Sequence, residues 1–188
     1  MIAYKLTDQN MQTYNGFQWS LNKEATSSGE GKLCSNGWLH FYSDPLLAIF
    51  LNPIHANIKI PRLFEGIAGN TLLHDGELKS GTTSLILTKE LDVPFVSITN
   101  RIAFGILCAK KVYFNVEWNK WADDWLNNVD RTEKSAVNAC DCARDNTAAA
   151  CASADVMYPT AKAGAIVPSI DKSITRLTQM AKDSLLIK

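Results

Sequence analysis

The sequence has little of what marks several protein classes. No apolar run approaches the ~20 residues that a membrane-crossing helix needs, and the opening residues 1–5 lack the long apolar region of a secretory signal. Nineteen basic residues balance nineteen acidic ones among 188, so the cationic excess that nucleic-acid binding requires is missing. We expect a cytoplasmic protein with no membrane partner, and the charge balance disfavours direct binding to nucleic acid.

Cysteine and histidine are few and irregularly spaced. The five cysteines form an odd set with no CxxC pair, and the three histidines, fifteen and nineteen residues apart, match no zinc motif. The phosphate-binding patterns GxGxxG and GxxxxGK are absent as well. The sequence therefore predicts reduced thiols, no metal site and no classical nucleotide cofactor.

Two halves of the chain differ in patterning. Up to about Ser97, glycine, proline and asparagine separate short apolar runs, whereas beyond it apolar residues recur at helical spacing and alanine is abundant. This predicts an α+β fold, with a small mixed or antiparallel β-rich part at 1–97 packed with a bundle of about four helices at 98–188. The two parts could instead form one continuous domain.

Local patterns place the elements within each half. Asp44 or Ser43 is the expected cap of a helix that has Pro45 in its first turn and ends at Pro53. Strands are expected at 2–6, 16–19, 56–60 and 83–88, and the later helices at 98–115, 117–128, 130–159 and 169–185.

The segment from 116 to 155 carries eight acids and four bases, and it also holds three tryptophans. Trp118, Trp121 and Trp125 share one helix face, which favours a core role and leaves an interface role open. An acidic patch of Asp123, Asp124 and Asp130 with Trp121 would suit a basic protein partner. The alternative is an ordinary solvated surface.

Residues 35–48 read as a turn, a strand with aromatic and polar groups, and a capped helix whose amino end can receive an anion. This resembles, in outline, the second strand and following helix of the ADP-ribosyltransferase-like fold. The resemblance implies NAD as cofactor and a carboxylate that stabilises an oxocarbenium-like ribose. The sequence departs from that pattern in having no Arg or His on the first strand, no Ser-Thr-Ser and no Glu-x-Glu. The site residues implied are Tyr4, Lys5, His40, Tyr42, Ser43 and Glu65 or Glu77.

Two further blocks resemble small uncharacterised proteins of phages and prophages, which have a β-rich first half and an Ala-rich helical second half. The first block joins Gly16-Phe17-Gln18 to residues 36–40 and Asp44-Pro45, and the second runs over 101–110 and on through the three tryptophans to Asp130-Arg131. The resemblance implies a phage protein in the host cytoplasm. Small phage proteins of this kind often bind and inhibit a host factor, as anti-CRISPR and other counter-defence proteins do.

The titratable groups lie far apart in the sequence, which favours a protein without catalytic activity. We therefore expect a phage-encoded module that inhibits a host protein or complex by surface binding. The first alternative is an NAD-dependent ADP-ribosyltransferase-like enzyme, or a degenerate relative that keeps only the pocket. The second is a homo-oligomeric structural protein, and the oligomeric state is left open.

Overall fold

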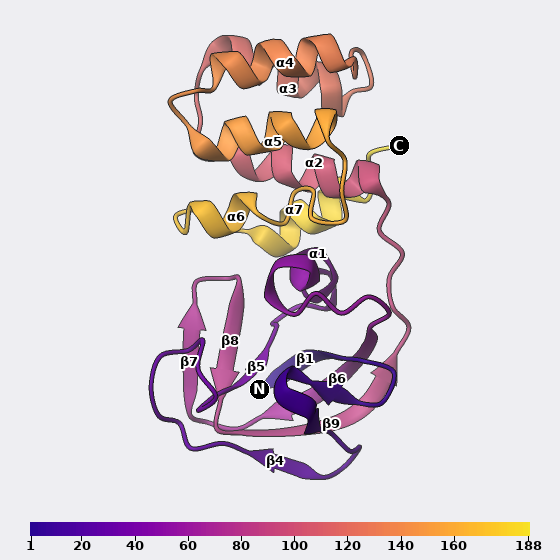
Figure 1. The fold of residues 1–188 in the computed structure, drawn as a ribbon, viewed down its shortest axis with the longest axis vertical. Helices are drawn as coiled ribbons and strands as arrows, with labels where there is room; N and C mark the ends of the chain where they lie inside the picture. The colour runs from indigo at the N-terminus through magenta and orange to yellow at the C-terminus, as the bar shows by residue number, and fades with distance from the viewer. The chain divides into compact units, whose positions relative to one another are not determined.

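The computed structural model describes residues 1–188 and divides into two compact units, Met1–Phe95 and Val96–Lys188. The first unit is β-rich and the second is helical (Figure 1), so the chain has the predicted α+β composition. All named strand pairs are antiparallel.

Nine strands and one α-helix build the N-terminal unit. Its elements are β1 (Ile2–Thr7), β2 (Gln12–Thr13), a 3-10 turn (Tyr14–Gly16), β3 (Phe17–Gln18), β4 (Glu24–Thr26), β5 (Leu39–Phe41), α1 (Pro45–His55), β6 (Arg62–Ala68), β7 (Leu72–Asp75), β8 (Lys79–Thr82) and β9 (Ser84–Leu91). The strands form a sheet in the order β1-β6-β9-β4, a sheet in the order β5-β8-β7, and the β2–β3 hairpin.

The two larger sheets are joined at two places. β8 and β9 follow one another with only Thr83 between them, and the Thr82 hydroxyl donates to the carbonyl of Ser84 at 3.0 Å across this bend. A backbone bridge between Tyr4 and Tyr42 then joins β1 to the end of β5. Strand pairing therefore links β5 to β8 in one sheet and β9 to β6 and β1 in the other, and the chain itself connects β8 to β9. The core cluster of this unit is Ala3, Trp19, Leu39, Phe41, Phe64, Ala68, Leu85 and Leu87.

Helix α1 begins as the sequence predicts and ends later. The Asp44 carboxylate accepts from the backbone N–H of Leu46 at 2.8 Å, and Pro45 occupies the first turn. Pro53 lies inside the helix, which continues to His55, so the predicted end is wrong. The predicted strand at 56–60 is also wrong. There the Asn52 side chain bonds both the N–H and the carbonyl of Ile58, which fixes a loop.

Six helices, rather than about four, build the C-terminal unit, because two predicted long helices are each divided. They are α2 (Ile98–Ala109), α3 (Val116–Leu126), α4 (Glu133–Cys142), α5 (Thr147–Met157), α6 (Val167–Ile170) and α7 (Leu177–Ser184). Asn146 caps α5 by accepting from Ala149 N–H at 3.0 Å, and this interrupts the alanine-rich run. Thr132 caps α4, which therefore begins later than the predicted helix at 130–159.

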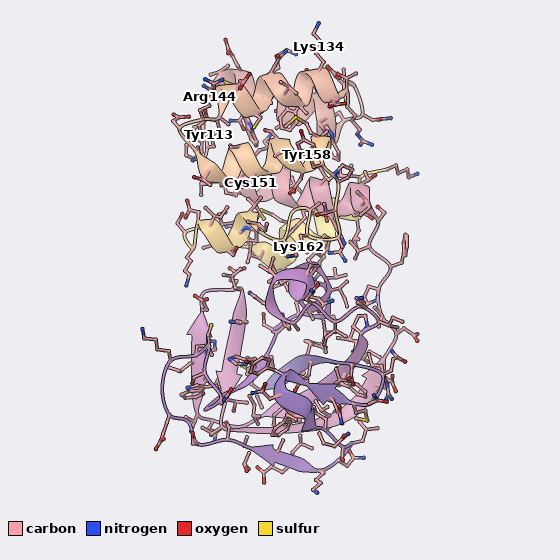
Figure 2. All side chains as sticks on the ribbon, viewed as in Figure 1. Tyr113, Lys134, Arg144, Cys151, Tyr158 and Lys162 are labelled. Atoms are coloured by element: carbon pink, nitrogen blue, oxygen red, sulfur yellow. The ribbon has the colours of Figure 1, made fainter.

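Helix α2 packs against α5, α6 and α7, while α3 packs against α4. Trp118, Trp121 and Trp125 are all buried, as the helical periodicity predicts for a core face. Tyr113, labelled in Figure 2, follows α2 and donates its hydroxyl to the carbonyl of Cys142 at 2.9 Å, which ties the end of α2 to the end of α4. None of the helices combines the length and apolar character needed to cross a bilayer.

Candidate functional site

A cavity of about 770 Å³ lies in the N-terminal unit. It is formed by β1, the β2–β3 hairpin, the segment from Cys34 through β5 to Tyr42, the end of α1, and β8. The volume falls in the ~300–1,000 Å³ range of small-molecule sites. Its aromatic lining consists of Tyr14, Phe17, Trp19, Trp38 and Tyr42, and its other ionisable side chains are Lys5, Asp8, Cys34, His40, His55 and Lys79.

Lys5 is the half-buried cation of this cavity. Its Nζ donates to the carbonyl of His40 at 2.6 Å and lies 5.0 Å from the ring centroid of Trp19. Lys5 makes no ion pair with a carboxylate. Burial without such a partner disfavours the charged form and lowers the pKa of Lys5 to about 8.

Tyr42 and His55 form a second polar group in the cavity. The Tyr42 hydroxyl lies 3.0 Å from Nδ1 of His55, and the two rings stack. Burial raises the pKa of Tyr42. Burial, followed by the nearby charge of Lys79, lowers the pKa of His55 to about 4. Both side chains are therefore neutral near pH 7.

The remaining polar groups of the cavity have hydrogen-bond partners within the protein. Nε2 of His40 bonds the carbonyl of Leu33, and burial lowers the pKa of His40. The Asp8 carboxylate accepts from two backbone N–H groups of its own turn. At the other side, Nζ of Lys79 donates to Sγ of Cys34 at 3.1 Å.

The structure brings together only part of the site implied by the ADP-ribosyltransferase resemblance. Lys5, His40 and Tyr42 line the cavity, whereas Ser43 does not. Tyr4 and Glu65 lie opposite one another in the pairing of β1 with β6. Neither of them lines the cavity. Glu77 is outside the lining as well.

Trp19, His55 and Lys79 line the same cavity although nothing in the sequence singled them out. The fold therefore brings titratable groups that are far apart in the sequence to one cavity. No short-range pattern links them, because the tertiary fold brings segments that are distant in sequence to one cavity.

The predicted partner-binding residues lie in the C-terminal unit. Asp123 pairs with Lys110, and Asp124 pairs with Lys120 at 2.6 Å, so their charges are partly neutralised. Asp130 accepts from the backbone N–H of Thr132 at 2.9 Å. Trp121 is only 8% exposed and belongs to the core. Trp121, Asp124 and Asp130 border a small hollow of about 260 Å³.

The fold and the cavity define an α+β protein whose β-rich unit has room for a small molecule. Residues 1–98 match a family described as a domain of unknown function, DUF7666, and the chain belongs to that family. The match covers the N-terminal unit and therefore the whole cavity. No curated protein and no solved structure matches the chain.

Proposed function

We propose that the N-terminal unit binds a small anion that carries a planar ring, of the kind that NAD and other nucleotides represent. The observation that carries the proposal is the position of Lys5, a half-buried cation over Trp19 with no carboxylate partner. A desolvated cation without a counter-charge is unfavourable alone, and an anionic ligand would remove that cost. Trp38 and Phe17 add aromatic surface for a ring.

Binding without turnover is the form of this proposal that the cavity supports best. No glutamate lines the cavity, and Asp8, its one acidic side chain, is engaged by backbone N–H groups. A carboxylate to stabilise an oxocarbenium-like ribose is thus not in place. We therefore favour a relative of the ADP-ribosyltransferase-like fold that keeps the pocket, over an active NAD-dependent transferase.

Calorimetric titration of the full chain with NAD and with ADP-ribose tests this proposal. We expect binding, and we expect Lys5→Gln to weaken it by about tenfold or more because a hydrogen bond from a charged donor is lost. Lys89→Gln, at an exposed position on β9, is the matched control and should bind like the wild type. Absence of binding by the folded wild type would refute the proposal, and release of nicotinamide would favour the transferase.

Protein binding by the C-terminal unit is the second candidate. This unit lies almost entirely outside the family match and exposes large apolar side chains, including Phe114 at 79% and Val116 at 82%. In this proposal the chain is phage-encoded, acts in the host cytoplasm, and inhibits a host factor in the manner of an anti-CRISPR protein. Exposed apolar residues beside acidic ones are typical of a surface for a protein partner.

Affinity capture from a host lysate with the full chain tests this second function. We expect a stoichiometric partner whose recovery falls when Asp123 and Asp124 are both changed to Asn. These substitutions remove charge from residues of α3 that are not buried, so the helical content should be retained. Recovery that is unchanged would exclude the acidic patch as the binding surface.

A further inference from the structure

Lys5 lines the cavity and makes no ion pair with the protein. We infer that Lys5 reacts covalently through Nζ with an aldehyde or ketone that carries an anionic group. The inference rests on the proposed function only in placing an anionic ligand in the same cavity. It adds the reactive group of that ligand and the bond that forms.

The geometry around Nζ suits a nucleophile. Lys5 donates one hydrogen bond, to His40 O at 2.6 Å, which leaves the lone pair of the neutral amine free. The Trp19 ring, 5.0 Å away, removes water from one side. Since the pKa of Lys5 is about 8, roughly a tenth of the amine is neutral at pH 7, against less than about a thousandth for an ordinary lysine. Lysines desolvated in this way are a recognised class of covalent nucleophile.

The reaction step balances without an oxidant or reductant. The Nζ lone pair attacks the carbonyl carbon, a C–N bond forms, and the C=O π pair moves to oxygen, which takes a proton. Nitrogen gives up its two protons in all and the oxygen gains two, so the oxygen leaves as water and an imine remains. Lys79, also in the lining, is a cation that can hold the anionic group of the ligand.

Reductive trapping on the full chain tests the inference directly. The probe is pyridoxal 5′-phosphate, a planar anionic aldehyde, with sodium cyanoborohydride at pH 7, and the labelled lysines are located and timed by mass spectrometry. We expect Lys5 to be labelled at least about tenfold faster than the exposed Lys59 and Lys89, given its larger neutral fraction. Labelling of Lys5 no faster than that of these two lysines would overturn the inference.

Two controls distinguish imine formation at Lys5 from non-covalent binding of the probe. Pyridoxine 5′-phosphate has an alcohol in place of the aldehyde, so it should slow the labelling of Lys5 and leave Lys59 unchanged. Lys5→Arg keeps the charge and should abolish only the label in that peptide. If this variant fails to fold, the site-by-site rates in the wild type still decide the question. Fast labelling in a protein that binds neither NAD nor ADP-ribose would refute the proposed nucleotide binding alone. Nucleotide binding with slow labelling would refute this inference alone.

Discussion

The hydroxyl oxygen of Tyr42 lies 3.0 Å from Nδ1 of His55, and the planes of the two rings are 19° apart. The chain turns from β5 into α1 between these residues, so the pair links the end of a strand to the end of a helix. Because the pKa of Tyr42 is raised and that of His55 is lowered, the tyrosine O–H is the donor and the imidazole nitrogen the acceptor near pH 7.

Removing this donor should destabilise the N-terminal unit. Tyr42→Phe leaves the half-buried Nδ1 of His55 without its partner, and we expect a loss of about 1–3 kcal/mol in the free energy of unfolding. Urea denaturation measures the loss. Tyr14→Phe is the matched control, since Tyr14 is 80% exposed and should change stability by less than about 0.5 kcal/mol. Equal effects of the two variants would contradict a structural role for the pair.

Truncating a buried tryptophan tests the core of the helical unit. Trp121 is 8% exposed on α3, and its ring centroid lies 5.6 Å from that of Trp118. Trp121→Ala should therefore lower the free energy of unfolding by about 3–5 kcal/mol through the cavity it leaves. Val116→Ala, at an exposed position of the same helix, should have little effect. A loss below about 1 kcal/mol for Trp121→Ala would place the indole outside the core.

The helices that the sequence predicts well are those that begin with a capping side chain and carry apolar residues at helical spacing. Ser97 caps α2 by accepting from Asn100 N–H, and Asp44 caps α1, because these short side chains match the orphan N–H groups of a helix start. The division between α4 and α5 was harder to predict. Ala-rich sequence continues through it, and Asn146 is compatible with either a helix interior or a cap.

The cavity could be predicted only in part. His40 and Tyr42 lie two residues apart, and a local pattern can draw attention to both. Lys79 lies on β8, which pairs with the distant β5, and Trp19 follows the β2–β3 hairpin. The alternation of side chains along a strand specifies which face each one occupies but not which other segments lie against that face. For the same reason the resemblance-based choice of Glu65 selected a residue that does not line the cavity.

Gly164 is required where its loop approaches α2. Its φ is +70°, and a Cβ there would lie 1.9 Å from the carbonyl oxygen of Arg101. Gly164→Ala should thus cost more than about 3 kcal/mol, since both the conformation and the contact are unfavourable. Gly76 has φ +55° with open space around it, so Gly76→Ala measures the conformational cost alone, about 1 kcal/mol. Similar losses measured by thermal unfolding would contradict the close approach.

His55 makes the N-terminal unit sensitive to acid. The pKa of His55 is about 4 in the folded chain and about 6.5 in an unfolded one, so the unfolded state binds the extra proton between these values. The stabilisation is complete above pH 6.5 and is lost as the pH falls toward 4, by about 2 kcal/mol. Hydrogen exchange of peptides from residues 1–95 should therefore accelerate on acidification, after correction for the intrinsic rate. His55→Gln should reduce this response and leave the smaller part that the half-buried His40 contributes, whereas His74→Gln, which retains both histidines, should keep all of it.

Asp155 gives the C-terminal unit the opposite response. Its carboxylate accepts from Gly164 N–H at 2.6 Å, yet burial outweighs this bond and raises the pKa of Asp155 to about 6. The folded state therefore holds the proton at a higher pH than the unfolded state does, and stability increases as the pH falls from 7 to 4. Asp155→Asn keeps an acceptor oxygen and removes the charge, so we expect a gain of about 1–2 kcal/mol at pH 7 and a flatter profile. Hydrogen exchange of peptides from residues 96–188 at pH 4.5 and 7 measures the gain in stability and its dependence on pH. If acid accelerated exchange equally in the two units, this assignment of their pH dependence would be contradicted.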